Sequence, residues 1–480
     1  MKYTPYIGLE IHSELKTKTK IFCSCKNDPE EKNPNINICP ICTGQPGTLP
    51  VINREAVKKT IKTGLALNCK ISEISKFDRK NYFYPDLPKG YQISQYDKPF
   101  CIDGYLEIKG KKIRIKRIHL EEDTGRLIHP AGKNYSLVDF NRAGVPLMEL
   151  VTEPDLSSEK EAREFAETLQ LILKYLDVSE ADMEKGQMRV EVNISLTKDE
   201  KLGTKVEIKN LNSFRAVERS INYEIKRQSE ILDKNKKVEQ ETRGWDDQKE
   251  ITVRQRKKEE ANDYRYFPEP DLPTLYLDKG FIEKIKAEIP ELPAFRKKRL
   301  IDEYKLNDKE AEIFTINKDL GEYFEKVISE LAPRLPVEKL RSLIKLTTNY
   351  LISDVLGLLK GSYFIEKEFK ITPENFAGFI SLIYEGKISS KIAKMVLEEM
   401  FISGADPLHI IKERGLDQLK DEGEIEKIVK EVILKNPQAV NDYKKGKKSA
   451  LQFLVGQIMA KTRGRAEPNI VQQLLKKLLQ

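Results

Sequence analysis

Apolar and polar residues alternate near the start of the chain, which predicts a half-buried β-strand over residues 7–14. Successive side chains of a strand point to opposite faces, so Glu10, His12 and Glu14 share one face. Glu10 and His12 are two residues apart, roughly 7 Å along a strand, which is close enough to share a divalent ion or a proton. A charged face turned to solvent is the alternative interpretation of this pattern.

The same alternation recurs in two later segments, residues 189–194 and 205–209. Glu191 occupies a polar position of the first segment, and Lys205 and Glu207 occupy polar positions of the second. Each segment alone is typical of a charged solvent face. Three strands with one pattern favour a shared site in which carboxylates and cations meet.

An acidic cluster at residues 119–125 follows a further strand, predicted over residues 112–120. If all these strands share a sheet, one face collects the candidate ligands Glu10, His12, Glu122, Glu191 and Glu207. Carboxylates with a histidine suit Mg²⁺, and the surrounding lysines and arginines suit phosphate. The combination is typical of a phosphoryl-transfer site.

The pattern divides the rest of the chain into a mixed region and two helical regions. Strand and helix signals alternate to about residue 290, proline-rich segments follow, and only helical patterns continue beyond residue 294. A Gly-Pro break near residues 403–407 divides the helical part. We predict an α+β fold: a mixed or antiparallel, cradle-like sheet domain over 1–292, an all-α domain over 293–405 and a small all-α tail over 406–480.

Length and composition fit a soluble protein of several domains. A chain of 480 residues is too long for one core. Charged residues make up 33% of it, mean hydropathy is −0.53, and no apolar run approaches the roughly 18 residues of a membrane helix. The first residues lack the apolar core of a signal peptide. We therefore expect a cytoplasmic protein without membrane contact.

The cysteines give the most specific local signal. Cys23-x-Cys25 and Cys39-x-x-Cys42 each place two sulfurs at one turn, and two such turns build a tetrahedral Zn²⁺ site. Four thiolates leave no open coordination position, so we predict a structural zinc knuckle within the first domain. Four incidental reduced thiols are the alternative.

Positive charge is concentrated at the end of the chain. The net charge is +8, and residues 430–480 contain 11 Lys and Arg against 3 Asp and Glu. Such asymmetry predicts a tail that binds RNA or phosphate. A solvated basic face is the alternative.

Several familiar motifs are absent from the sequence. It contains no G-x-x-x-x-G-K-[ST] loop, no G-x-G-x-x-G turn and no H-E-x-x-H pattern. Any nucleotide site is therefore of another kind.

Several longer motifs together resemble the B subunit of the tRNA-dependent amidotransferase family. They are collinear over the first 290 residues: Ile7–His12, Lys76–Pro85, His119–Gly125, Leu137–Gly144, Lys209–Phe214 and Asp263–Asp271. The segment Gly464–Pro468 before a last helical pattern resembles the family's tail domain.

The resemblance implies an activity, cofactors and partners. The family converts misacylated Glu-tRNA(Gln), and in many organisms Asp-tRNA(Asn), to the amidated form. The B subunit is similar to a kinase that uses ATP and Mg²⁺ to phosphorylate the side-chain carboxylate. The glutaminase (amidase) partner, the A subunit, supplies ammonia from glutamine, and the small C subunit clamps the complex. The implied metal site again comprises Glu10, His12, Glu122, Glu191 and Glu207, with Lys80 and Lys205 as phosphate contacts.

Two other functional classes remain as alternatives to this ligase activity. One is a zinc-containing RNA-binding scaffold without chemistry. The other is a catalytic zinc hydrolase, which would need a zinc ion with a bound water.

Overall fold

The computed structural model describes residues 2–28, 30–199, 201–257, 264–334, 336–416, 419, 421–462 and 464–479. The chain divides into two compact units, Met1–Leu292 and Pro293–Gln480.

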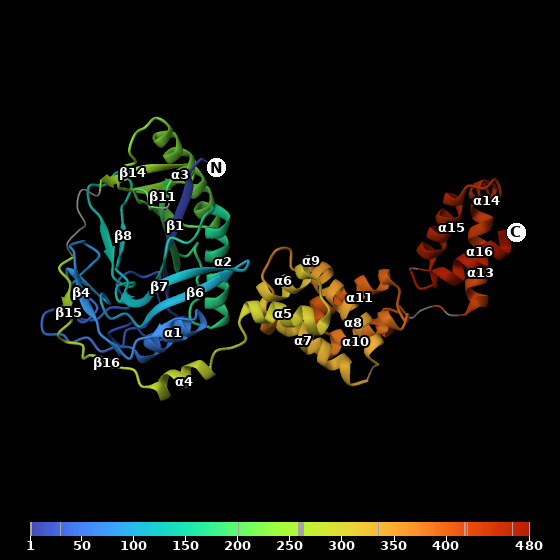
Figure 1. Cartoon of the computed structure of the whole chain (residues 1–480). Helices are drawn as coiled ribbons and strands as arrows, with labels where there is room; N and C mark the ends of the chain where they lie inside the picture. Colours follow the sequence, from blue (N-terminus) through green and yellow to red (C-terminus); the bar gives the residue numbers. More distant parts are fainter. Residues whose placement is uncertain are drawn as a thin grey trace. The chain divides into compact units, whose positions relative to one another are not determined.

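The N-terminal unit is built around one large sheet (Figure 1). In the described residues this sheet has nine strands in the order β14-β13-β12-β11-β1-β10-β7-β6-β2, and all neighbours are antiparallel except β12 and β13. Its strands are β1 (Thr4–Glu14), β2 (Lys70–Ile71), β6 (Cys101–Ile108), β7 (Lys111–Glu122), β10 (Pro146–Thr152), β11 (Met188–Thr197), β12 (Val206–Leu211), β13 (Glu241–Asp246) and β14 (Ile251–Lys257).

Three helices cover one face of this sheet (Figure 1). Helix α1 (Arg54–Ala66) contacts β6 and β7, α2 (Glu159–Tyr175) contacts β6, and α3 (Phe214–Asp233) contacts β11, β12 and β14. The apolar residues of β1 that alternate with Glu10 and His12 are at most 1% exposed and lie in this core. The polar residues of β1 are therefore directed to the opposite face.

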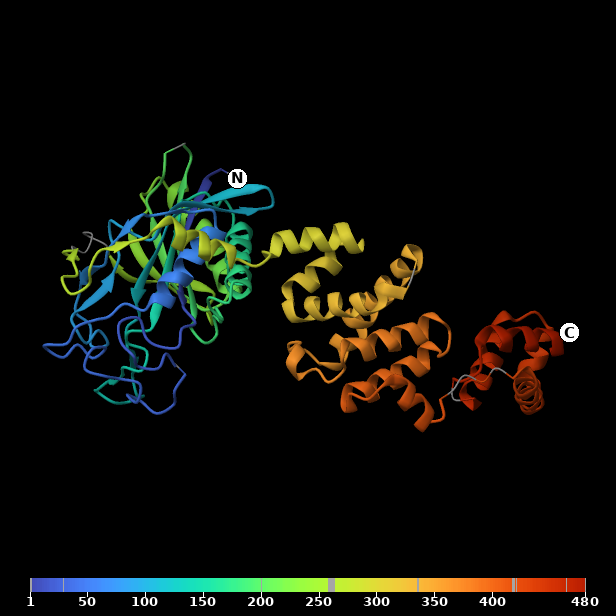
Figure 2. The same cartoon turned by 90° about the horizontal axis from the view of Figure 1, so that it is seen from below.

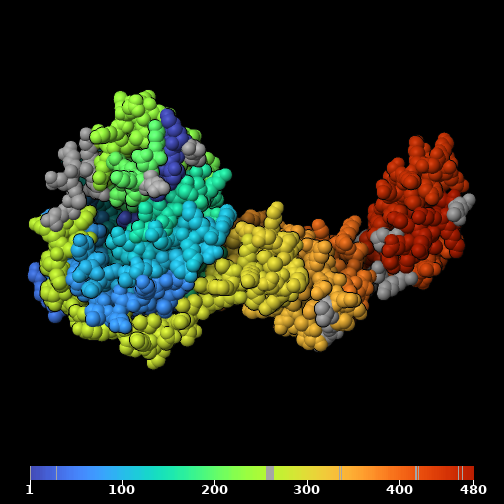
Figure 3. All heavy atoms as spheres, in the orientation of Figure 1, coloured from blue at the N-terminus to red at the C-terminus, as the bar shows by residue number. Residues whose placement is uncertain are grey.

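Smaller sheets border the large one. In one of them β4 (Asp78–Asn81) lies between β15 (Phe267–Pro268) and β5 (Tyr91–Ser94). The other two pair β16 (Leu275–Tyr276) with β3 (Ile74–Ser75), and β8 (Arg126–Ile128) with β9 (Leu137–Asp139). Residues 264–292, with helix α4 (Lys279–Ala287), run along the surface of the unit beside β4, β3 and α1 (Figure 3). This segment brings tyrosines 264 and 266 next to β4.

The described elements of the C-terminal unit are helices, with one isolated β-bridge between Leu419 and Ala466 (Figure 2). Its helices are α5 (Pro293–Tyr304), α6 (Asp308–Ile316), α7 (Lys318–Leu331), η1 (Ala332–Arg334), α8 (Val337–Asn349), η2 (Tyr350–Val355), α9 (Leu356–Leu358), η3 (Glu366–Glu368), α10 (Pro373–Tyr384), α11 (Ser390–Ser403), α12 (Pro407–Glu413), α13 (Glu422–Lys435), α14 (Pro437–Lys444), α15 (Lys448–Lys461) and α16 (Pro468–Leu479). One apolar core extends from Leu300 to Leu416, and a second from Ile425 to Leu479.

The structure confirms the predicted fold class, a mixed sheet domain followed by helices. The domain limits at 292 and 405 stay predictions; Ile410 and Ile411 of α12 belong to the first of the two helical cores. Two local differences concern the site. Strand β7 continues through Glu122, past the predicted end at residue 120, and strand β10 was not predicted.

Candidate active site and metal centre

The register of the central strands gathers charged side chains on the open face of the sheet. His12 lies opposite Glu149 of β10 on one side and opposite Arg189 of β11 on the other. Glu149 in turn lies opposite His119 of β7. Opposed residues of neighbouring strands share a face, so the two histidines flank one carboxylate.

The resulting cluster is compact and mostly buried. The Nε2 atoms of His12 and His119 each lie 3.3 Å from Oε2 of Glu149. Oxygens of Glu121 lie 3.8 Å from His12 Nε2 and 3.6 Å from His119 Nε2. Two overlapping sets could each hold a metal ion, with ligand atoms within 4.8 Å of one another: Glu10, His12 and Glu149, and His119, Glu121 and Glu149.

The electrostatics of this cluster favour a bound cation. Burial and then the nearby carboxylates of Glu149 and Glu191 raise the pKa of Glu10. Burial would lower the pKa of His119, but Glu149 and Glu121 outweigh it and raise the pKa to about 9. The Glu10 carboxylate is thus repelled by those of Glu149 and Glu191, and a divalent ion beside it would relieve this repulsion.

Lys80 lies near the same cluster and is bordered by aromatic rings. Burial would lower its pKa, but Glu121, Tyr266 and Glu149 raise it, so the ammonium stays charged. Its Nζ atom lies 5.9 Å from the ring centroid of Tyr82 and 5.1 Å from that of Tyr264. A charged lysine here can contact a phosphate, as predicted.

Glu191 and Glu207 lie on the same face but outside both compact sets. Lys209 Nζ lies 2.7 Å from a carboxylate oxygen of Glu191 and 3.7 Å from one of Glu207. The hydroxyl of Thr242 donates to Glu207 over 2.6 Å. Lys205 is exposed and lines a separate hollow. Lys209, not Lys205, is therefore the cation nearest these carboxylates.

Glu122 faces away from the cluster. Because β7 continues through residues 121 and 122, their side chains point to opposite faces. Glu122 accepts hydrogen bonds from Lys89 Nζ over 2.6 Å and from the Ile93 amide over 2.8 Å. The structure brings Glu121 to the histidines in place of the predicted Glu122.

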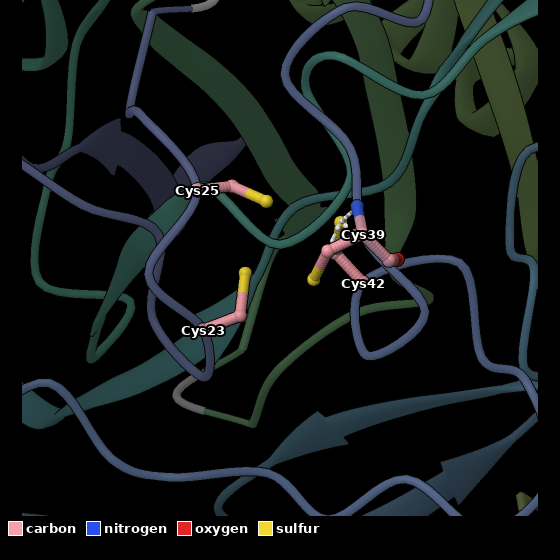
Figure 4. A group of neighbouring side chains, drawn as sticks. All are labelled: Cys23, Cys25, Cys39 and Cys42. Carbon is pink, nitrogen blue, oxygen red and sulfur yellow. Dashed lines mark hydrogen bonds between the residues drawn. The ribbon is translucent and has the colours of Figure 1, made fainter.

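The four cysteines converge as their spacing predicted (Figure 4). The sulfurs of Cys23, Cys25, Cys39 and Cys42 lie within 4.8 Å of one another, so the cluster could hold a metal ion. The Cys39 amide donates to Cys42 Sγ over 3.2 Å. A hydrogen bond with Cys23 and the nearby Lys20 ammonium lower the pKa of Cys42 to about 5. A thiolate is the form that binds a metal.

Sequence reasoning missed Glu149, His119 and Lys209 as members of the site. His119 and Lys209 follow the same period of two as their predicted neighbours and could have been included. Glu149 lies within the short apolar run of residues 146–152, where a single charged residue gives little periodicity. Its place beside His12 depends on the order of the strands.

A mixed sheet whose polar face could hold a metal ion, followed by a helical unit, is the arrangement of a candidate catalytic domain joined to a helical module. Family models match both parts: one described as the GatB/GatE catalytic domain matches residues 5–283, and one described as the GatB domain matches residues 322–479. The chain belongs to the GatB family.

Several relatives are similar over their full length, and each is named as the B subunit of an aspartyl/glutamyl-tRNA(Asn/Gln) amidotransferase. The Thermotoga maritima protein is 49% identical over 490 residues, covering 100% of both chains. The Carboxydothermus hydrogenoformans protein is 49% identical over 484 residues, covering 99% of this chain and 98% of the relative. The Persephonella marina protein is 49% identical over 485 residues, covering 100% of both. The family resemblance inferred from the sequence motifs is confirmed.

No helix in the described part of the chain is both long enough and apolar enough to cross a bilayer.

Proposed function

We propose that this chain is the component of a tRNA-dependent amidotransferase that activates the side-chain carboxylate of misacylated Glu-tRNA(Gln), Asp-tRNA(Asn) or both. The enzyme is an ATP-dependent ligase that forms a C–N bond. The observation that carries the proposal is the cluster of Glu10, His12, Glu149, His119 and Glu121 on the open sheet face. The names of the full-length relatives supply the substrate class.

The donor set fits Mg²⁺. Carboxylates with an imidazole offer the hard oxygen and nitrogen ligands that Mg²⁺ accepts, and the mutual repulsion of the carboxylates favours a cation. Glu10, His12 and Glu149 would hold the ion, with Glu121 as a further candidate. When bound, Mg²⁺ neutralises charge on the transferred phosphoryl group and helps to orient it.

The reaction has two group transfers. An oxygen of the substrate carboxylate forms a bond to the γ-phosphorus of ATP as the bond to the ADP oxygen breaks. Ammonia then attacks the acyl carbon, loses a proton and forms the amide as inorganic phosphate leaves. Lys80, whose ammonium lies near Glu121 and Glu149, would contact the transferred phosphoryl group. Lys209 keeps the charges of Glu191 and Glu207 balanced beside the site.

The four cysteines are assigned to a structural zinc ion. Four sulfurs complete a tetrahedral zinc, so this ion has no open position for substrate. Its proposed role is to hold together the two cysteine-containing turns that follow β1.

This chain acts within a complex on tRNA, as the relatives' name implies. The expected partners are a glutaminase (amidase) protein, which releases ammonia, and a small third component of the same complex. The basic tail is assigned to the tRNA backbone, where contacts with phosphates make binding sensitive to salt.

The test is Mg²⁺-dependent release of ADP by the assembled complex with Glu-tRNA(Gln). Replacing His12 by alanine should abolish ADP release and leave the affinity for tRNA within twofold. His129 is exposed and outside the cluster, so His129→Ala is the matched control. Full ADP release by His12→Ala would favour a scaffold without chemistry. Zinc bound by fewer than four sulfurs, with a water ligand, would favour the hydrolase.

A further inference from the structure

Lys20 lies between β1 and the cysteine cluster and is completely shielded from solvent. Its Nζ atom donates to the backbone oxygen of Phe140 over 3.2 Å and to Sγ of Cys42 over 3.7 Å. A lysine is almost never fully buried unless its charge is paired. The question is therefore what balances this ammonium.

The cysteine cluster is the group that can balance the charge of Lys20. The Phe140 carbonyl supplies a hydrogen bond but no opposite charge, so it does not by itself compensate for burial of the ammonium. A zinc ion bound by four thiolates carries an excess of negative charge, because the thiolates outweigh the metal. One of these four sulfurs, that of Cys42, accepts from Lys20. The buried lysine and the loaded cluster are therefore complementary.

Hydrogen bonds also join the loop between the two cysteine pairs to residues 138–145, which we call the linking segment. Asn35 lies in that loop, and its amide oxygen accepts from the Phe140 amide over 2.8 Å. The Asn37 amide donates to the amide oxygen of Asn141, a residue that is 1% exposed, over 2.9 Å. The zinc loop and the linking segment are thus held side by side.

The linking segment in turn contacts Asp123, next to the candidate Mg²⁺ ligands. The Gly144 amide donates to the backbone oxygen of Asp123 over 2.9 Å, and Arg142 Nε lies 3.6 Å from Oδ2 of the Asp123 carboxylate. The same Oδ2 atom lies 3.0 Å from Arg189 Nη2. Arg189 is the residue of β11 that lies opposite His12. A continuous set of contacts therefore leads from the cysteines to the strand partner of a candidate ligand.

We infer that Lys20 is a positioning residue that couples the cysteine cluster to the open face of the sheet. With zinc bound, its ammonium is held between the Cys42 sulfur and the Phe140 carbonyl, and the linking segment is fixed beside Asp123. Loss of the ion frees the sulfurs from their common position, so Lys20 loses its charged partner and the linking segment loosens. The inference rests on the zinc assignment proposed above and gives that ion an effect on the Mg²⁺ site.

The first test measures metal binding at the sulfurs of the full-length chain. Lys20→Met keeps an unbranched side chain and removes the ammonium. Partners just outside a metal's ligands typically change affinity 10- to 100-fold, so we expect the affinity for Co²⁺, followed by thiolate-to-cobalt absorption, to fall at least tenfold. An unchanged affinity would overturn the inference.

Lys59→Met is the matched control for this titration. Lys59 is also largely buried and donates to a backbone oxygen, that of Asp177, and it has no hydrogen bond to a cysteine among the described residues. The control variant should keep its Co²⁺ affinity within twofold of the wild type, even if its thermal midpoint falls.

The second test loosens the linking segment without changing Lys20 or a cysteine. Asn35 has a φ of +58°, a conformation that glycine adopts freely, so Asn35→Gly keeps the backbone and removes the bond to the Phe140 amide. With zinc bound, residues 138–145 should exchange amide hydrogens faster, as mass spectrometry measures. The Mg²⁺ affinity should fall at least fivefold in calorimetric titration.

Asn235→Gly provides the control for the second test. Asn235 has a φ of +53° and is exposed just after α3, so this substitution makes the same chemical change away from the zinc loop. It should leave the Mg²⁺ affinity unchanged. If Asn35→Gly also kept its Mg²⁺ affinity within twofold of the wild type, the coupling would be overturned.

The cobalt titration separates failure of this inference from failure of the proposed function. Co²⁺ binding by the wild type without a thiolate-to-cobalt band would refute the zinc assignment and the inference with it. A thiolate band that Lys20→Met does not weaken would refute the inference alone. None of these measurements reads ADP release, so the coupling can hold even if the kinase function is wrong.

Discussion

His12 Nε2 and Glu149 Oε2 lie 3.3 Å apart on neighbouring strands, and the same oxygen lies 3.3 Å from His119 Nε2. Burial would raise the pKa of Glu149, but the two imidazoles hold it well below its usual range. Glu149 is thus ionised and common to both candidate ligand sets. A single carboxylate connects them.

Glu149→Gln should therefore weaken Mg²⁺ binding more than the loss of a carboxylate that belongs to only one of the two candidate ligand sets. The substitution keeps the shape of the side chain but removes the charge that both histidines and the cation need. We expect Mg²⁺ affinity to fall at least 100-fold and ADP release to be lost. Calorimetric titration with Mg²⁺ measures the first and a coupled ADP assay the second. Mg²⁺ affinity within threefold of the wild type would show that Glu149 is not a ligand.

Glu121 and Glu122 are sequence neighbours with different expected roles. Glu121→Gln should lower Mg²⁺ affinity, because the Glu121 carboxylate faces the two histidines. Glu122→Gln should leave Mg²⁺ affinity unchanged and lower the thermal midpoint, because it removes the partner of the largely buried Lys89 ammonium. Each of these two variants serves as the matched control for the other. The opposite result, with Mg²⁺ affinity dependent on Glu122, would return the ligand role to the residue that the sequence suggested.

The contrast between these two residues shows how far the sequence could predict the site. A period of two is a local property, so it correctly directed Glu10 and His12 to one face and predicted a polar strand around Glu191. Whether residue 121 or 122 faces that side depends on where β7 ends, and strand ends are not encoded by periodicity. The sequence alone therefore left the choice open.

Glu149 shows a different reason for failure. Its strand β10 lies between β1 and β7 in the sheet, although β1 is distant in the sequence from both β7 and β10. Such pairing is set by long-range packing and by the register of each strand, so it cannot be predicted from the local sequence pattern. The cysteine cluster was predictable for the opposite reason, since Cys23, Cys25, Cys39 and Cys42 lie within 20 residues.

Removal of zinc should destabilise the N-terminal unit. Cys42→Ser removes one of the four sulfurs, and a structural zinc contributes directly to folding. We expect the zinc content to fall below one ion per chain and the thermal midpoint to drop by several degrees. A strong chelator should lower the midpoint of the wild type but not that of Cys42→Ser. Cys69→Ser changes a buried thiol outside the cluster and should keep its zinc, as metal analysis can verify.

Glu14 should make stability depend on pH near neutrality. Burial, and then the charge of Asp123, raise the pKa of Glu14 to about 7 from its usual 4.5. Between pH 4.5 and 7, Glu14 is protonated in the folded state and ionised in the unfolded state. The contribution of Glu14 to the free energy of unfolding is therefore complete below pH 4.5 and is lost as the pH rises through 7. The loss is on the order of 3 kcal/mol.

The comparison of Glu14→Gln with the wild type isolates this effect. The glutamine variant cannot ionise, so its thermal midpoint should fall less than that of the wild type between pH 5 and pH 8. Glu159, a partly exposed residue in the first turn of α2, provides the control variant Glu159→Gln. Parallel pH profiles for the Glu14 variant and the wild type would mean that Glu14 is already ionised at pH 5.

The structure gives a better boundary for truncating the tail than the sequence did. A cut at the predicted limit of residue 406 would remove Ile410, Ile411 and Leu416 from the first helical core. Removing residues 417–480 instead takes away the second core and leaves the first intact. This truncation should keep the thermal transition of the N-terminal unit and weaken tRNA binding at least tenfold.

Charge in the tail is divided between paired and unpaired lysines, which allows a finer test. Lys430 and Lys435 pair with acidic residues one turn away on α13. Lys444 and Lys445 are exposed and show no ion pair among the described residues, so they are available to phosphates. Replacing both by alanine should reduce the slope of log affinity against log salt by about two, since each lost phosphate contact lowers it by about one. Lys430→Ala should change neither the slope nor the affinity. If Lys430→Ala had the same effect as the double replacement of Lys444 and Lys445, the tail would be a solvated basic face without specific phosphate contacts.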